Sequence, residues 1–319
     1  MTQPPDAEFS PRRFSTADVA ERDRLSRWRE EFGRALVRCD IAPAEPDMPF
    51  RAEATMRMLP GVRTALCDGT AARYERTSAL AAQGDDAIGL IVNLGPQAIV
   101  SQGDNSLALA TGDAFPFCTD QAGTLITTRH LGMLFPREVL ASRVEDIDRA
   151  VTRMVPNTVE PLRLLVNYIA LVREQVAVGS PELRQTIANH IHDLAAMTLG
   201  ATRDTRESSL GAVAAARLAA VLTDISRSFT EPGLTLAAVA LRQGVSPRYL
   251  QRLFEESGMS FTARVNELRL QRAFALLSRE HNRSRPISEI AWQAGFANVS
   301  HFNRLFRRRF GDTPSGVRA

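Results

Sequence analysis

Two segments in the last third of the sequence place arginine and amide side chains at helical spacing. In the first, Arg248 is followed by Gln251 and Arg252 at spacings of three and four, so the three side chains share one face of a helix. Arginine makes paired hydrogen bonds to the edge of guanine, and glutamine does the same at the edge of adenine. The spacing therefore predicts a helix that reads base pairs in the major groove of double-stranded DNA.

The second segment is a copy of the first. Residues 286–307 align with residues 235–255, with one extra residue in the second turn. The exposed face of its trailing helix carries Ser300, Asn303, Arg304, Arg307 and Arg308. A charged face on a single amphipathic helix is usually only solvated. The same face repeated after the same turn favours DNA recognition.

A glycine interrupts each copy. Gly244 and Gly295 suit the left-handed backbone conformation that ends a helix, and Ser246 and Asn298 stand where the next helix needs an N-cap. Pro247 falls at the first helical position, where its missing N–H costs nothing. Each copy is therefore predicted to fold as helix, turn, helix. The inward positions of the trailing helices are Leu250, Leu253, Phe254, Phe302, Leu305, Phe306 and Phe310.

The segment between the copies, residues 260–278, repeats apolar side chains at helical spacing. A helix of about 20 residues spans roughly 30 Å. That length is close to the ~34 Å of one turn of DNA, so both trailing helices are expected to reach one side of the duplex.

These motifs resemble the DNA-binding domain of the AraC/XylS family of transcription regulators over residues 216–318. The matching stretches are V-S-P-R-Y-L-Q-R-L-F (245–254), G-M-S-F (258–261), R-L-x-x-A-x-x-L-L (269–277), I-x-x-I-A-x-x-x-G-F (287–296) and S-H-F-N-R-L-F-R-R-R-F-G-x-T-P (300–314). The resemblance implies two helix-turn-helix subdomains joined by one helix, which read adjacent segments of the major groove.

The resemblance also implies roles for single residues. Arg248, Gln251 and Arg252 would contact bases in the first half, and Ser300, His301 and Arg304 hold the equivalent positions in the second. Val299 is expected to contact a thymine methyl group, whereas Arg307 and Arg308 are expected to bind phosphate. The complete set of expected DNA-contacting residues is Ser246, Arg248, Gln251, Arg252, Val299, Ser300, His301, Asn303, Arg304, Arg307 and Arg308.

The charge is distributed unevenly along the 319 residues. The net charge is +3, and every basic residue is an arginine. Residues 208–319 hold 16 arginines and 8 acidic residues, whereas residues 1–207 hold 23 and 28. A basic half joined to an acidic half suggests that the basic half meets a polyanion.

The N-terminal half follows a different period. Residues 50–58 alternate strictly between apolar and polar side chains, which is typical of a half-buried strand. Further short strands are predicted at 62–66, 88–94, 98–101, 107–110 and 125–129, separated by glycine-containing turns. Short strands at this spacing predict a sandwich, jelly roll or barrel. Residues 26–39 are predicted to form a short helix.

The expected fold class is a two-domain α+β chain. We expect a disordered start at 1–24, a sensor domain at 25–158, a helical hairpin at 159–200, a linker at 201–209 and the DNA-binding domain at 210–319. The sensor domain resembles a cupin-like jelly roll, with Gly112-Asp113 as its turn and Phe135-Pro136-Arg137 closing the barrel. The hairpin either packs on the β-rich domain or, as the resemblance implies, carries a dimer interface.

A cupin-type metalloenzyme with a DNA-binding appendage is the competing class. Cupin metal sites need clustered histidines and a carboxylate, but none of the five histidines precedes His130. No nucleophile-elbow, zinc-protease or phosphate-loop motif occurs. We therefore expect no enzyme activity, no metal and no cofactor.

Cysteine usage and hydropathy bear on the compartment. The three cysteines are scattered, no apolar run approaches the ~20 residues of a membrane helix, and the first residues lack the apolar region of a secretory signal. These features indicate a reduced, cytoplasmic protein that does not enter the membrane.

The sequence says least about the ligand of the sensor domain. Arg51, Arg73, Arg76 and Arg129 are candidate anchors for a carboxylate or phosphate of a small-molecule effector. Two alternatives to a small molecule stay open: a regulator that needs no ligand, and one controlled by a protein partner. An exposed apolar patch in place of a pocket would indicate the protein partner. The overall expectation is a transcription regulator, activating by resemblance, that works as a homodimer with RNA polymerase.

Overall fold

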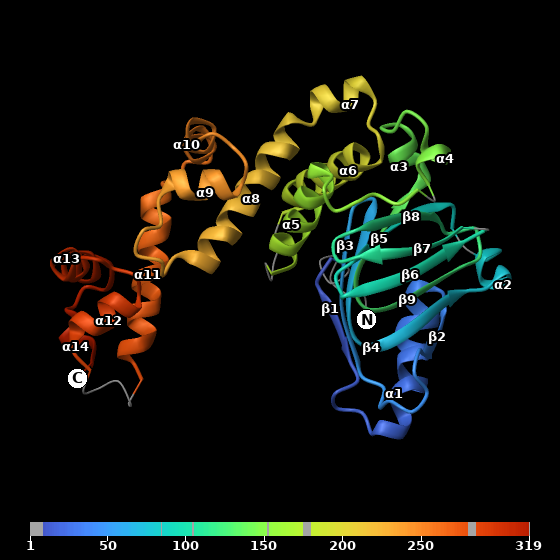
Figure 1. The fold of residues 1–319 in the computed structure, drawn as a ribbon, viewed down its shortest axis with the longest axis horizontal. Helices are drawn as coiled ribbons and strands as arrows, with labels where there is room; N and C mark the ends of the chain where they lie inside the picture. Colours follow the sequence, from blue (N-terminus) through green and yellow to red (C-terminus); the bar gives the residue numbers. More distant parts are fainter. Residues whose placement is uncertain are drawn as a thin grey trace. The chain divides into compact units, whose positions relative to one another are not determined.

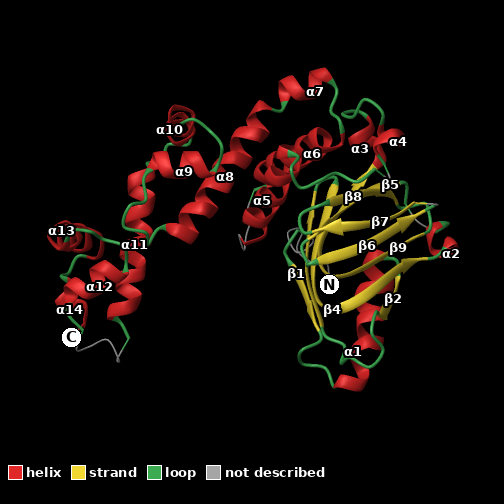
Figure 2. Cartoon of the chain, viewed as in Figure 1, coloured by secondary structure: helices red, strands yellow, loops and turns green. Residues whose placement is uncertain are grey.

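The computed structural model describes residues 9–83, 85–103, 105–151, 153–174, 180–279 and 285–318. The chain divides into two compact units, Met1–Ala216 and Arg217–Ala319, here called the N-terminal and C-terminal units. The first combines a sheet with helices, and the described part of the second is helical (Figures 1 and 2). The expected α+β class, with a β-rich half followed by a helical half, is confirmed.

Nine described strands form one antiparallel sheet in the N-terminal unit. Its main path runs β1-β3-β4-β9-β5-β8, with β2 added beside β4 and the β6–β7 hairpin beside β9. The strands are β1 (Arg12–Ser15), β2 (Asp40–Pro43), β3 (Ala52–Leu59), β4 (Val62–Arg76), β5 (Ala87–Asn93), β6 (Gln97–Gln102), β7 (Asn105–Ala110), β8 (Ala114–Cys118) and β9 (Gly123–Pro136). All six predicted strands are present, and β4 and β9 extend well beyond their predicted ends.

Helices cover parts of this sheet and lead out of it. They are α1 (Glu21–Trp28), η1 (Arg29–Val37, a π-helix), α2 (Ser78–Ala81), α3 (Arg137–Ala141), α4 (Ile147–Ala150), α5 (Glu160–Glu174), α6 (Pro181–Leu199) and α7 (Arg203–Ser208). Helices α5 and α6 are the predicted pair. Helix α6 lies against the sheet, where His192 Nε2 is 3.0 Å from the carbonyl oxygen of Gly61.

The start of the chain and the expected linker differ from expectation. Residues 12–15, within the start expected to be disordered, form β1 and pair with β3, with Arg12 opposite Met56. A charged strand is stable at a sheet edge because its backbone makes the hydrogen bonds while its side chains stay in water. The expected linker at 201–209 contains α7, which Thr202 caps by accepting a hydrogen bond from the amide of Thr205.

The C-terminal unit holds two similar three-dimensional copies joined by a helix. Helix α8 (Leu210–Ser228) leads into α9 (Leu236–Arg242) and α10 (Pro247–Glu256). Helix α11 (Phe261–Leu277) then connects to α12 (Ile287–Gln293), α13 (Val299–Phe310) and α14 (Pro314–Arg318). Helix α11 has 17 residues, so it spans about 25 Å rather than the expected 30 Å.

Each copy has its own apolar core. Leu250, Leu253 and Phe254 of α10 are buried, as are Phe302 and Phe306 of α13. The second core adds one face of α11, including Leu270 and Leu277. The inward faces predicted from the sequence are therefore buried, with Leu305 and Phe310 partly buried at the rim.

Candidate DNA-reading surface and sensor cavity

The turns that introduce α10 and α13 have the predicted geometry. Gly244 and Gly295 adopt φ angles of +64° and +96°. Ser246 Oγ accepts a hydrogen bond from the amide of Tyr249 at 3.2 Å, and Asn298 Oδ1 accepts one from the amide of His301 at 2.8 Å. Because these caps satisfy amides in the first turn, each helix begins at a fixed residue and presents its exposed face reproducibly.

The exposed face of α10 carries the predicted basic and amide groups. Arg248, Gln251 and Arg252 all face solvent. Gln251 donates a hydrogen bond to Glu255 at 3.0 Å, and the Arg252 guanidinium lies 5.2 Å from the Tyr249 ring centroid. Exposed contacts of this kind contribute little stability, so they can be exchanged for contacts to a base at small cost.

The exposed face of α13 is the more basic of the two. Ser300, His301, Asn303, Arg304, Arg307 and Arg308 face solvent, and Val299 is half-buried. An open groove runs along α13 past Asn303, Arg304 and Arg307, with Thr313 and Pro314 on its other wall. Arg304 lies 3.1 Å from His301 Nδ1. We call α10 and α13 the reading helices.

Ion pairs outside the reading faces join helices within each copy. Arg309, next to the exposed Arg308, points away from the reading face and bonds to Glu267 of α11 at 2.9 Å. That hydrogen bond lowers the pKa of Glu267 below its ordinary value. In the first copy, Arg242 of α9 bonds to Asp224 of α8 at 3.1 Å.

Contacts near the turn of the second copy connect it to the first copy. Arg269 of α11 donates to the carbonyl oxygens of Phe229 at 2.7 Å and Glu231 at 2.9 Å. Gly295 packs on the same segment, and a Cβ added to it would lie 2.8 Å from the Cα of Thr230. The relative position of the reading helices therefore depends on this junction as well as on α11.

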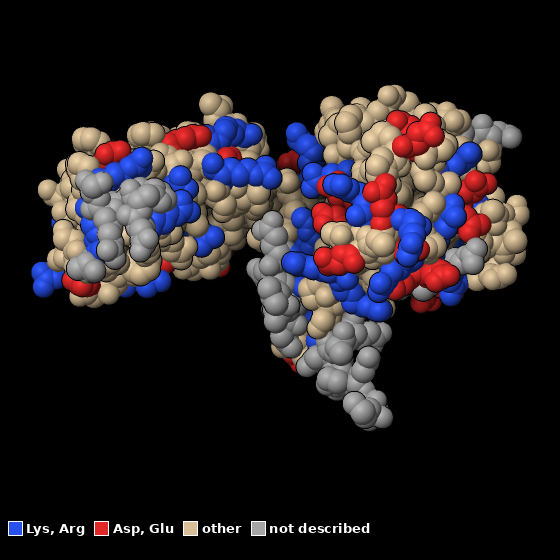
Figure 3. Space-filling model, turned by 90° about the horizontal axis from the view of Figure 1, so that it is seen from below, with Lys and Arg blue, Asp and Glu red and all other residues tan. Residues whose placement is uncertain are grey.

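Basic and acidic side chains are mixed on the face of the N-terminal unit that Figure 3 shows, whereas basic ones predominate on the C-terminal unit. This distribution agrees with the charge asymmetry of the sequence. Long-range attraction of a polyanion is thus concentrated on the unit that carries the reading helices.

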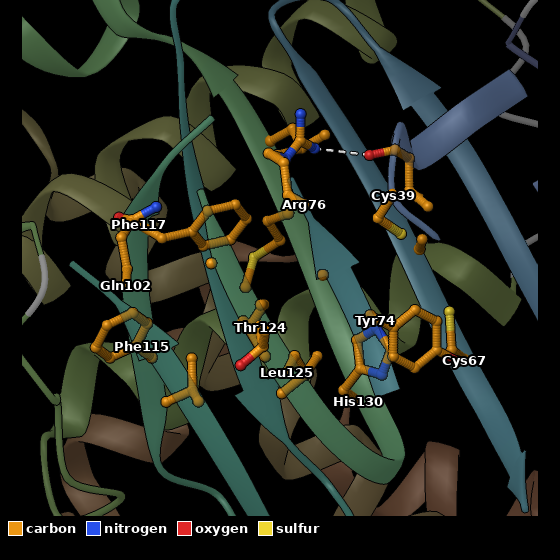
Figure 4. A pocket seen from close by; sticks show the side chains of 18 of the residues that line it. Cys39, Cys67, Tyr74, Arg76, Gln102, Phe115, Phe117, Thr124, Leu125 and His130 are labelled. Carbon is orange, nitrogen blue, oxygen red and sulfur yellow. Dashed lines mark hydrogen bonds between the residues drawn. The ribbon is translucent and has the colours of Figure 1, made fainter. Parts of the chain in front are cut away.

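The N-terminal unit encloses a cavity of about 130 Å³. Side chains from η1 and from strands β3, β4, β5, β6, β8 and β9 line it, so the sheet curves around it (Figure 4). Most of the wall is apolar, including Phe32, Phe115, Phe117, Leu125 and Met133. The polar lining groups are fewer: Arg63, Tyr74, Arg76, Gln102, Thr124 and His130 are the main ones.

Of the four arginines predicted as effector anchors, Arg76 lines the cavity. The other three are exposed, Arg73 and Arg129 on the sheet and Arg51 just before β3. Arg73 lies 3.6 Å from Glu75, and Arg129 lies 3.1 Å from Asp68. Sequence reasoning missed Arg63, Tyr74, Gln102 and His130, which also line the cavity.

One end of the cavity is uncharged. His130 is buried beside Tyr74, with ring centroids 5.1 Å apart, and its Nδ1 has no hydrogen-bond partner in the structure. Burial lowers the pKa of His130 to about 4, so the imidazole is neutral at physiological pH. Burial also raises the pKa of Cys39 to about 12, which keeps that thiol protonated.

His130 makes the stability of the N-terminal unit depend on pH. Its folded-state pKa lies below the ordinary 6.5, so its contribution is fully present above pH 6.5 and is lost as pH falls towards 4. Between pH 7.5 and 4.5 the protonation of this group should lower the free energy of unfolding by roughly 2–3 kcal/mol. Urea unfolding followed by Trp28 fluorescence in a Trp292→Phe background measures the loss.

The matched variant is His130→Phe, which keeps a ring beside Tyr74 but cannot titrate. Other titrating groups are common to both proteins, so the difference between their pH profiles isolates His130. A variant that lost stability as steeply as the parent below pH 6.5 would contradict the assignment.

Within the described ranges, no three histidine, cysteine or acidic side chains are grouped so that they could hold a metal ion. The same part of the chain contains no helix with the length and apolarity needed to span a membrane.

Comparisons with known proteins cover both units. The profile of an AraC-binding-like domain matches residues 28–200, and that of a helix-turn-helix domain matches residues 239–319. The chain is 27% identical over 183 residues to the transcriptional activator RhrA of Rhizobium meliloti, a match that spans 57% of this chain and 57% of RhrA. It is 25% identical over 299 residues to the transcriptional activator NphR of a Rhodococcus species, which spans 90% of this chain and 86% of NphR.

Among solved structures, the AraC-like transcriptional activator CuxR is 21% identical, with a TM-score of 0.49 over 83% of this chain and 96% of CuxR. The family assignment rests on the sequence profiles, one of which covers more than half of the chain. The paired helix-turn-helix copies and the β-rich N-terminal domain are the two parts that this family combines. The chain belongs to the AraC family of transcriptional regulators.

Proposed function

We propose that the chain binds a specific site in double-stranded DNA through both reading helices and thereby activates transcription. The observation that carries this proposal is the repetition. Two capped helices, each after a glycine turn, expose arginine and amide side chains within one compact unit. The printed names of RhrA and NphR as transcriptional activators support activation as the direction of control.

The proposed readout assigns bases to side chains near the start of each reading helix. In α10, Arg248, Gln251 and Arg252 contact base edges. In α13, Ser300, His301 and Arg304 do so, with Val299 against a thymine methyl group and Asn303 as a further polar contact. Arg307 and Arg308, later in α13, bind phosphate. Ser246 adds a contact at the start of α10.

The remaining parts of the proposal concern assembly and control. The chain acts in the cytoplasm, where its DNA lies, as a homodimer formed through the N-terminal unit, and it contacts RNA polymerase as an activator. An effector in the N-terminal unit controls it. The cavity favours a small molecule over a protein partner, because small molecules bind in concave, mostly apolar sites of this kind.

Arg248→Ala should weaken binding to the specific site by about 1–3 kcal/mol while leaving binding to random DNA nearly unchanged. The side chain has no ion pair with any described residue, so its removal breaks no internal contact. Affinities are measured by fluorescence anisotropy at one fixed salt concentration, on a duplex recovered by selection and on a scrambled duplex.

Arg307→Ala is the matched control from the other reading helix. A phosphate contact carries no sequence information, so this variant should lose affinity for both duplexes about equally and show a shallower salt dependence. If Arg248→Ala left the ratio of specific to random affinity at its parent value, base reading by Arg248 would be ruled out.

A further inference from the structure

We propose that the effector is a compact carboxylic acid whose apolar body is about the size of one aromatic ring, bound in the cavity with its carboxylate at Arg76. This inference deepens the proposed function, since it rests on the N-terminal unit being the sensor. It is drawn from the charge at one end of the cavity, from the cavity's size and wall, and from its lack of charge at the other end.

A small pocket beside the cavity brings three guanidinium groups together with one carboxylate. Arg38, Arg63 and Arg76 line this pocket together with Asp85. Asp85 lies 3.5 Å from Arg38 and 3.8 Å from Arg63. Within the described residues, no other carboxylate lies within ion-pair distance of these three arginines. An excess of positive charge in a confined site favours an anionic ligand.

Two members of this group, Arg63 and Arg76, also line the cavity, and of these two it is Arg63 that pairs with Asp85. The Arg76 guanidinium donates to the carbonyl oxygens of Val37 at 2.7 Å and Thr119 at 3.4 Å, which fixes its position. Burial lowers its pKa, the sign of a charge that has lost part of its hydration. A ligand carboxylate would accept hydrogen bonds from the remaining N–H groups of Arg76, and little ordering would be needed because the guanidinium is already held in place.

The opening of the cavity lies at this charged end. A more open, polar pocket shares Arg76, Gln102 and Thr124 with the cavity, while His130, Tyr74 and Phe115 line only the inner part. In Figure 4, Arg76 lies at the top of the view, Gln102 at the left beside Phe117, and His130 with Tyr74 at the lower right. A ligand that entered here would leave its charged group near the opening and its body inside.

The inner part sets the size and polarity of that body. The cavity holds about 130 Å³. Apolar protein cavities of about 150 Å³ stay dry and bind benzene. The rings of Phe115 and Phe117 and the neutral imidazole of His130 offer no charge to a second polar group. A single ring or a short alkyl chain therefore fits, whereas a sugar or a nucleotide does not.

Calorimetric titration of the full chain with matched acids and amides tests the proposal. The pairs are benzoate with benzamide, phenylacetate with phenylacetamide, and hexanoate with hexanamide. We expect at least one acid to bind with one site per chain, and its amide to bind at least about tenfold more weakly. Amides that bound as tightly as the acids, or no acid binding up to millimolar concentration, would overturn the proposal.

Arg76→Gln and Arg73→Gln form a matched pair on strand β4. Arg76→Gln should lower the affinity for the acid at least about tenfold and leave that for the amide unchanged. Arg73→Gln, on the outer face of the strand, should change neither. Equal acid affinity in all three proteins would place the carboxylate elsewhere. Should Arg76→Gln not fold, the acid–amide comparison in the parent decides.

Measurements of acid binding and of DNA binding test this inference and the proposed function separately. Specific DNA binding without binding of any acid would remove the assigned ligand and leave the DNA function standing. Acid binding by a chain that lacks sequence-specific DNA binding would remove the regulator role and leave the site standing.

Discussion

Gly295→Ala is expected to detach the second helix-turn-helix copy from the first. A Cβ at this position would lie 2.8 Å from the Cα of Thr230 and 2.9 Å from the carbonyl oxygen of Phe229. Both contacts are with backbone, so the second copy must shift. The left-handed backbone of Gly295, with φ +96°, adds strain for an alanine. Together the two effects should lower the free energy of unfolding by about 2–5 kcal/mol. The variant should lose protection of residues 287–310 in hydrogen exchange and lose contacts to one of the two DNA blocks.

The equivalent glycine of the first copy supplies the control. Gly244 also has a positive φ, +64°, but a Cβ there meets nothing within 4 Å. Gly244→Ala should therefore cost only the backbone strain, about 1–2 kcal/mol, and keep both DNA blocks. Equal losses in the two variants would mean that the contact with residues 229–230 does not fix the second copy.

Phe306→Ala is expected to unfold much of the second copy. Its ring is fully buried and lies 5.4 Å from the ring of Phe302 and 4.7 Å from that of Phe310. Truncating a buried phenylalanine costs about 3–5 kcal/mol, a large part of the 5–15 kcal/mol by which a domain is stable. Hydrogen exchange in α12 and α13 should accelerate, while α10 stays protected.

Phe274 provides a control in the same aromatic cluster. Its ring stacks on that of Phe306 at 6.4 Å, but the residue is 37% exposed. Phe274→Ala should therefore cost less, about 1–2 kcal/mol. If both substitutions destabilised α13 equally, Phe306 would not be the centre of this core.

The helical unit could be predicted closely from the sequence because its signals are local. A glycine with a positive φ, a capping Ser246 or Asn298 and a proline at the first helical position act within a few residues of chain. The junction between the copies could not be predicted. It depends on Gly295 meeting Thr230, 65 residues earlier, and no local pattern encodes that contact.

The cavity was poorly predicted because strand β4 changes phase. Side chains on a regular strand alternate between faces, but the pairing of β4 with β9 shifts between Asp68 and Ala72. Before the shift, Arg63 and Cys67 line the cavity, and after it Tyr74 and Arg76 do. The residues of β4 that face the cavity are therefore odd-numbered before the shift and even-numbered after it. Arg73 consequently lies on the outer face of the strand.

Strand β8 was missed for a related reason. Its sequence, Ala-Phe-Pro-Phe-Cys, contains a proline and lacks a polar–apolar alternation. Both signals argue against a strand. The strand forms because tertiary packing buries Phe115 and β5 supplies the pairing.

Selection of bound fragments from randomised duplex DNA by the purified full-length chain tests the central claim most directly. We predict one enriched motif with two blocks about one helical turn apart, in which Arg248→Ala relaxes one block and Arg304→Ala the other. Salt-sensitive binding without an enriched motif would contradict it, because the exposed arginines would then contact only the phosphate backbone.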